Sequence, residues 1–127
     1  MAIIRSFRDL CVYQPARAEA LKVFRVPRTF PAEERYSLPD RIRRSARAVK
    51  SMLAEAWAHR RYRASFISKV TDALGEATET QSWLDDALDC EYITAPQHRE
   101  MDAAWPSIGA ALNQLIDRAD DFCRSAG

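Results

Sequence analysis

The residues of this chain that could perform nucleophilic or metal chemistry are few and far apart. Cys11, Cys90 and Cys123 are odd in number and widely separated, and they form no Cys-x-x-Cys pair. His59 and His98 lack the His-x-x-x-His or Glu-x-x-His spacing that builds metal sites in helical bundles. We therefore expect reduced, packed thiols, surface or capping histidines, and no bound metal.

Acid–base chemistry has equally little support. Glu55 is the single acid among eight basic residues between positions 41 and 63, and no second carboxylate lies at a useful spacing. We interpret it as a structural ion-pair partner. No glycine-rich phosphate loop and no nucleophile motif is present. The sequence therefore predicts that the chain is not an enzyme and needs no cofactor.

Phosphate binding is the chemistry that the residue types do favour, because sixteen of the nineteen basic residues are arginine. The guanidinium group matches a phosphate with two parallel hydrogen bonds. Neighbouring Trp57, His59 and Tyr62 could stack on bases. The candidate residues for binding nucleic acid or a partner are Arg41, Arg43, Arg44, Arg47, Lys50, Arg60, Arg61 and Arg63.

A second interpretation of these arginines is structural. The stretch from Ala64 to Glu91 is acidic, with seven carboxylates against Lys69 alone. Adjacent helices of opposite sign would pair with each other or across a subunit interface. We prefer this interpretation because a net charge of +1 is a poor match to a phosphate-binding domain.

Composition predicts the framework that must position these residues. A chain of 127 residues can bury one core, so residues 1–127 are expected to form a single domain. Three glycines, many alanines and few β-branched residues favour an all-α fold. The N-terminus lacks a signal-peptide core, and no apolar run approaches the roughly 18 residues of a membrane span. We expect a cytoplasmic protein without membrane contact.

Two helical segments are predicted in the first half. The first runs from Leu10 to Val26; because Pro15 is tolerated only in a first turn, regular helix should begin near Gln14 after a packed lead-in from Phe7 to Val12. Its buried face comprises Tyr13, Ala16, Ala20, Val23 and Phe24. The second segment runs from Leu38 to His59 with two seven-residue seams, formed by Leu38, Ser45 and Met52 and by Ile42, Val49 and Ala56. Arg43, Arg47 and Lys50 should form an outward basic stripe.

The third segment, from Ser65 to Cys90, repeats the heptad pattern. Its seams are Ile67, Leu74, Gln81 and Leu88 in one series and Val70, Ala77 and Leu84 in the other. Gln81 alone interrupts them. A single polar residue at a seam position usually determines register or pairing, so we interpret Gln81 as structural.

The fourth segment begins with Thr94 as N-cap and Gln97 as its capping-box partner. Met101, Ile108, Leu115 and Phe122 recur at every seventh residue, and Pro106 predicts a kink or break near Trp105. Ser125 to Gly127 should fray. Short connections between four such segments predict an antiparallel four-helix bundle in up-down-up-down order.

Four ordered stretches resemble one family, the bacterial four-helix-bundle proteins encoded in intervening sequences of 23S ribosomal RNA genes. The stretches are Phe7-Arg8-Asp9-Leu10 with Tyr13-Gln14, Phe30-Pro31 with Glu33-Glu34-Arg35-Tyr36-Ser37-Leu38, Ile42-Arg43-Arg44-Ser45-Ala46, and Ala73-Leu74-Gly75 with Glu79-Thr80-Gln81. The resemblance implies an up-down bundle without enzymatic activity, often a homopentamer. A related branch, the accessory protein of diversity-generating retroelements, binds a reverse transcriptase and nucleic acid, which makes both candidate partners.

The chain departs from this family at one motif. Where the family commonly reads Pro-Ser-Asn-Ile-Ala-Glu-Gly, positions 50–56 read Lys-Ser-Met-Leu-Ala-Glu-Ala, so the roles of the missing proline, asparagine and glycine do not carry over. The leading hypothesis is a non-enzymatic homo-oligomeric bundle, with a pentamer favoured, that acts as an interaction protein. The alternative is an accessory protein that binds RNA or DNA through its basic second helix.

Overall fold

A computed structural model describes residues 3–34 and 37–123, and across these ranges the chain is all-α, without a strand. The predicted fold class is confirmed. The helices are α1 (Tyr13–Arg25), α2 (Leu38–Ala58), α3 (Arg63–Asp89), α4 (Ala95–Asp102), α5 (Trp105–Asp117) and α6 (Ala119–Phe122). Short 3₁₀ turns are η1 (Phe7–Asp9), η2 (Val26–Thr29) and η3 (Ala32–Glu34). The expected fraying of residues 125–127 and the family-like pair at 35–36 lie outside the described residues.

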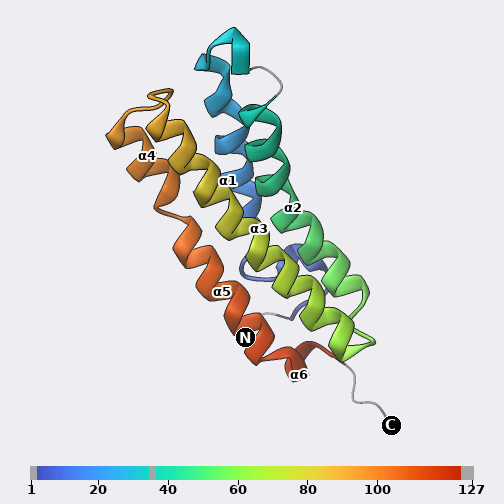
Figure 1. The fold of residues 1–127 in the computed structure, drawn as a ribbon. Coiled ribbons are helices and arrows are strands. Elements are labelled where there is room, and N and C mark those ends of the chain that lie inside the picture. Colours follow the sequence, from blue (N-terminus) through green and yellow to red (C-terminus); the bar gives the residue numbers. More distant parts are fainter. Residues whose placement is uncertain (1–2, 35–36, 124–127) are drawn as a thin grey trace.

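Figure 1 shows how the helices are layered. The chain runs up α1, down α2, up α3 and down α4 and α5. The two longest helices, α2 and α3, form the central pair, with α1 packed on α2 and with α4 and α5 packed on α3. The last of the four segments therefore consists of three helices, with the break near Trp105 that was expected and a further break that was not.

The N-terminal lead-in extends the layer that α1 begins. With 13 residues α1 is about 20 Å long, half the length of the 27-residue α3. The segment before it fills the remainder, because Leu10 and Val12 are 2% and 1% exposed and η1 contacts α2. Asp9 accepts hydrogen bonds from the backbone of Arg5 and Ser6 in a capping box. The predicted packed lead-in is confirmed, with α1 starting one residue before Gln14.

The seam between α2 and α3 differs from the predicted one on the α3 side. Val70, Ala77 and Leu84 are buried as expected, but Ile67, Leu74, Gln81 and Leu88 are only half-buried. The second buried series is shifted by one residue and comprises Phe66, Ala73, Thr80 and Ala87. Ile67 and Phe66 lie three and four residues before Val70, and both positions are on the same side of the helix as Val70. Heptad spacing alone therefore does not decide which of the two series is buried. The buried polar residue of α3 is therefore Thr80.

Thr80 is paired across the central helices. Its hydroxyl donates to Ser45 Oγ of α2 at 2.8 Å and also lies 2.9 Å from the Glu76 carbonyl oxygen. Ser45 Oγ donates to the Ile42 carbonyl at 3.2 Å. Both hydroxyls are buried and bonded, so this small polar contact between α2 and α3 carries no unpaired donor.

The last of the four segments, which contains α4, α5 and α6, is interrupted where Pro106 predicts a break. α4 ends at Asp102 and α5 starts at Trp105, which places Pro106 in the first turn of α5, where its missing N–H costs nothing. Thr94 and Gln97 form the predicted capping box at the start of α4. A further break at Arg118 separates α6, whose Phe122 stacks on Phe66 at 5.9 Å between ring centroids.

Candidate functional site

The eight basic candidates do not form one surface. Arg43 and Arg60 are seventeen residues apart along α2 and its C-terminal turn, which corresponds to about 25 Å along a helix axis. The first five candidates lie on α2 between Arg41 and Lys50, and the last three lie at the α2–α3 connection. The sequence predicted the residues but not this division.

The group at the α2–α3 connection is partly occupied by local contacts. Arg63 Nε pairs with Asp120 Oδ1 at 2.6 Å. The Arg60 guanidinium carbon lies 3.9 Å from the Trp57 ring centroid, and Arg60 also donates to the Trp57 carbonyl at 2.8 Å. Arg61 is exposed. Arg63 therefore links the start of α3 to α6, whereas Arg60 folds back onto the end of its own helix.

Of the five candidates between Arg41 and Lys50, Arg47 and Lys50 line a groove against α1, whereas the Arg41 guanidinium carbon lies 5.4 Å from the Trp83 ring centroid of α3. This groove has a volume of about 540 Å³, and Arg17, Arg47 and Lys50 provide its charge. Its floor is apolar, with Ala20, Leu21 and other small or apolar side chains of α1. The predicted outward stripe is thus wrong in one respect, because the neighbouring α1 converts it into one wall of a groove.

Phe24 connects this groove to a second one beside it. It was expected in the core face of α1 but is only half-buried, because it lies at the edge between α1 and α2. The second groove, of about 620 Å³, is lined by Phe24 together with Asp40, Arg43, Arg44, Arg47, Ala48 and Ser51. Sequence reasoning missed Arg17, Leu21 and Phe24 as surface residues, although positions 14, 17 and 21 recur on the polar side of α1.

The arginines of this surface form no ion pair with the acidic α3 among the described residues, although the charge of Arg44 acts on Glu76. Within the described ranges, the ion pair that joins α2 to α3 is Lys69 Nζ to Glu55 Oε2, at 3.2 Å. It joins the single acid of residues 41–63 to the single base of residues 64–91, which confirms the structural role of Glu55. The pairing of basic α2 with acidic α3 inside one chain is therefore absent among these residues.

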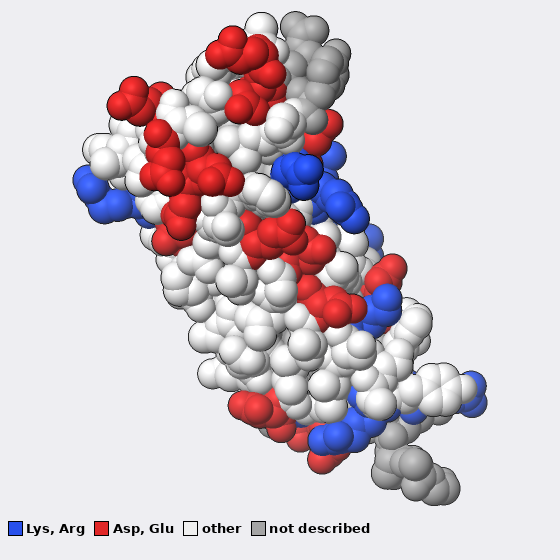
Figure 2. Space-filling view, in the orientation of Figure 1, with Lys and Arg blue, Asp and Glu red and all other residues white. Residues whose placement is uncertain are grey.

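The acids of α3 repel one another instead. Burial raises the pKa of Glu76, the adjacent Glu79 and Asp72 raise it further, and Arg44 opposes these effects. Figure 2 shows acidic side chains gathered over α3 and around the α3–α4 end, with basic ones at the edge formed by α2. In this view the acidic side chains are therefore concentrated over α3 and α4, and basic ones lie along the edge formed by α2.

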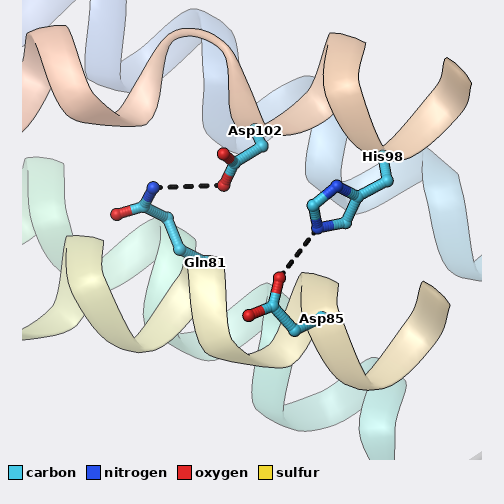
Figure 3. A network of polar contacts seen from close by, with 4 residues as sticks. All are labelled: Gln81, Asp85, His98 and Asp102. Atoms are coloured by element: carbon cyan, nitrogen blue, oxygen red, sulfur yellow. Dashed lines mark hydrogen bonds and ion pairs between the residues drawn. The ribbon is translucent and has the colours of Figure 1, made fainter. Parts of the chain in front are cut away.

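Polar contacts at the acidic end hold α4 on α3. Gln81 Nε2 donates to Asp102 Oδ1 at 3.1 Å, and His98 Nε2 lies 2.8 Å from Asp85 Oδ1 (Figure 3). The structural interpretation of Gln81 is confirmed, although it pairs α3 with α4 and not with α2. Both histidines take part in side-chain contacts, since His59 Nδ1 lies 2.8 Å from Ser65 Oγ.

Nucleophilic chemistry gains no support from the arrangement. Cys11 and Cys90 are exposed and Cys123 is half-buried, so the predicted packing of the thiols is wrong for the first two. Cys11 faces solvent because the lead-in turns Leu10 and Val12 inward on either side of it. Burial raises the pKa of the Cys123 thiol, which lowers its reactivity. The described residues contain no group of three side chains suited to a metal ion.

A buried carboxylate was also missed by the sequence reasoning. Glu19 of α1 is 7% exposed; one of its oxygens pairs with Lys22 Nζ at 3.1 Å, and Oε2 has no hydrogen-bond partner in the described part of the chain. No nucleophile or second carboxylate accompanies it in these contacts, so it forms no acid–base pair.

The surface over α5 is uncharged. Between Trp105 and Ile116 the helix carries no Lys, Arg, Asp or Glu. Its exposed side chains are small or neutral and comprise Pro106, Ser107, Ala110, Asn113 and Gln114. Figure 2 shows a broad area without charge over α5 and the lower part of α3. This neutral face differs sharply from a chain in which 29% of residues are charged.

Comparison with known proteins identifies relatives of the whole arrangement. A family model described as 23S rRNA-intervening sequence protein matches residues 8–114. A crystal structure of a protein of unknown function from the S23 ribosomal protein family of Bacteroides thetaiotaomicron is similar, with a TM-score of 0.75 and 27% identity. That match covers 84% of this chain and 95% of the other. No curated protein matches, and no helix among the described residues is long and apolar enough to cross a membrane.

Proposed function

The chain belongs to the family of 23S rRNA-intervening sequence proteins, and on this premise we propose that it is a non-enzymatic interaction protein that assembles with copies of itself. The neutral face over α5 is the observation that carries this proposal. Exposed helix surfaces without charge are unusual on a chain this rich in charged residues, and interface cores are depleted of charged side chains. The family resemblance favours a homopentamer, and we propose a cytoplasmic location.

Self-assembly is tested by placing a charge on this face. Ala110 is exposed on α5, and Ala110→Arg should leave the monomer folded but disrupt an interface that covers it. Light scattering after gel filtration should give a pentamer for the wild type and smaller species for the variant. Ala58→Arg is the matched control, since Ala58 is an exposed alanine at the end of α2. A wild type that is monomeric at micromolar concentration would refute assembly.

Nucleic-acid binding is the second proposed function, and the basic groove between α1 and α2 favours it. Arg43, Arg44 and Arg47 form no ion pair within the described ranges, so their charge is available to phosphates. The lack of these ion pairs argues against a purely structural role for the basic residues of α2 and in favour of a binding role. A partner protein such as a reverse transcriptase would compete for the same surface.

Salt dependence tests this second function. Each phosphate contact releases counterions, so the logarithm of the affinity should fall linearly with the logarithm of salt concentration, by roughly 0.7 per contact on a single strand. Arg43→Glu combined with Arg47→Glu should abolish binding to RNA or DNA, whereas Arg61→Glu should have a smaller effect because Arg61 lies outside the groove. Absence of binding at low salt, or binding unchanged by the double reversal, contradicts the proposal.

A further inference from the structure

Three guanidinium groups surround one aromatic ring at the α1–α2 edge. The guanidinium carbons of Arg43, Arg47 and Arg28 lie 4.6, 4.9 and 5.4 Å from the centroid of Phe24. Arg28 comes from η2 and the other two come from α2, so the cluster is brought together only by the packing of α1 on α2. Because all three carbons lie this close to the same centroid, any two of them are at most roughly 10 Å apart.

The cluster is ordered by contacts other than carboxylates. Arg43 Nε donates to the Phe24 carbonyl at 3.0 Å, so the Arg43 side chain is held by both the backbone and the ring of one residue. In the described part of the chain, none of the three arginines forms an ion pair. Asp40 lines the same groove without pairing with them.

This arrangement has an energetic consequence. Three like charges held around one ring repel each other, and the ring quadrupole compensates for only part of that repulsion. A bound anion would remove it. Arginine side chains also lose considerable conformational freedom when a ligand orders them, and a ring that has already oriented three of them reduces this cost. The cluster is therefore preorganised for an anion with several acceptor oxygens.

We propose that Arg28, Arg43 and Arg47, oriented by Phe24, form a clamp for the phosphodiester backbone of a single nucleic-acid strand. This inference rests on the proposed nucleic-acid binding and names where the strand is held. Arg28 is a member that the basic pattern of α2 could not reveal. Phe24 is a positioning residue: the guanidinium groups occupy the ring, so it orients the cations and does not serve as a platform for base stacking.

The chemistry of the clamp predicts what it recognises. Guanidinium groups read phosphate oxygens, so affinity should depend little on base identity and strongly on salt. The guanidinium fork also matches carboxylates, so an acidic protein is the competing partner that the test must separate from a nucleic acid. The probes that separate these cases are fluorescein-labelled oligothymidylate, oligoadenylate, and oligoglutamate of matched charge.

The experiment measures binding of these probes by fluorescence anisotropy to the full chain and its variants. Phe24→Leu keeps an apolar side chain but removes the ring, and we expect about tenfold weaker binding of both oligonucleotides. Phe24→Tyr keeps the ring and should bind as tightly as the wild type, since Phe24 is only half-buried. Phe7→Leu is the control for loss of a ring–arginine contact elsewhere, because Arg8 lies 4.5 Å from the Phe7 centroid.

A second variant keeps the test decisive if Phe24→Leu does not fold. Arg28→Gln should weaken binding several-fold and lower the salt slope by roughly 0.7, while Arg99→Gln, at an exposed arginine of α4, should change neither. Wild type that binds no oligonucleotide refutes the proposed function and the clamp together. If the wild type binds but Phe24→Leu or Arg28→Gln binds equally well, the clamp alone is wrong. Equal affinity for oligoglutamate overturns the assignment to phosphate.

Discussion

Removing the buried hydroxyl of Thr80 tests the geometry of the central helix pair. Thr80→Val preserves shape and β-branching, and deletes the donor that lies 2.8 Å from Ser45 Oγ. One net buried hydrogen bond is worth about 1 kcal/mol, so the free energy of unfolding should fall by about that amount. Ser45 keeps its own donation to the Ile42 carbonyl, so no donor is left unpaired.

Ser45→Ala removes the same bond from the other side. Its cost should be smaller, about 0.5 kcal/mol, because alanine is the better helix former and Thr80 can still donate to the Glu76 carbonyl. Each single substitution removes the same Thr80–Ser45 hydrogen bond, so the double variant loses that bond once and not twice. The double variant should therefore cost about 0.5 kcal/mol and not the sum of the single losses, which gives a coupling of about 1 kcal/mol.

Urea denaturation at fixed protein concentration measures the four variants of this cycle. Thr78→Val is the matched control, since Thr78 Oγ1 makes the same bond to a preceding carbonyl, that of Leu74 at 3.0 Å, on the exposed side of α3. Its effect should stay within about 0.5 kcal/mol. Additive losses in the double variant, or a Thr80→Val no worse than Thr78→Val, would refute the pairing.

Three further outcomes can be checked by denaturation or titration. Gly75→Ala should raise the free energy of unfolding by about 0.5–1 kcal/mol, because a Cβ there meets nothing within 4 Å; a loss of stability would mean that another chain covers this face. Thr94→Ala should lower it by about 1 kcal/mol through loss of the capping box at α4, and an unchanged midpoint would contradict this. Burial and the 2.9 Å hydrogen bond to Glu34 raise the pKa of Tyr92 to about 12. Because this pKa is above the unfolded value of about 10, the stabilisation is complete below pH 10 and lost as pH rises to about 12; absorbance titration should show a late-titrating component that disappears in Tyr92→Phe.

How far sequence patterns reach is clearest in α3. Heptad spacing predicted a helix there within two residues of its observed ends and one of its two seams. It chose the wrong second seam, because residues three and four positions away from Val70 lie on the same side of the helix. The choice between Ile67 and Phe66 depends on how α3 is rotated against α2, α4 and α5, and no local pattern contains that rotation.

The candidate surface shows the same limit more strongly. Arginine content and spacing made Arg43 and Arg47 candidates for phosphate binding, and the fold places both against Phe24. The pattern also grouped them with Arg60 and Arg63, which the fold places at the far end of α2 in contact with Trp57 and Asp120. Phe24 was predicted in the core but lies half-buried at the edge between α1 and α2. The periodicity of α1 alone does not show how far the neighbouring helix covers it.

By itself, the sequence determined the all-α class, the four arms of the chain, the break before Pro106 and the capping box at Thr94. These features depend on backbone and side-chain preferences that act within one or two helical turns. Only the tertiary structure decided that Thr80 meets Ser45, that α1 turns the basic stripe into a groove, and that Arg28, Arg43 and Arg47 converge on Phe24. Those contacts join residues that are distant in the chain, and they depend on how each helix is rotated and placed against its neighbours.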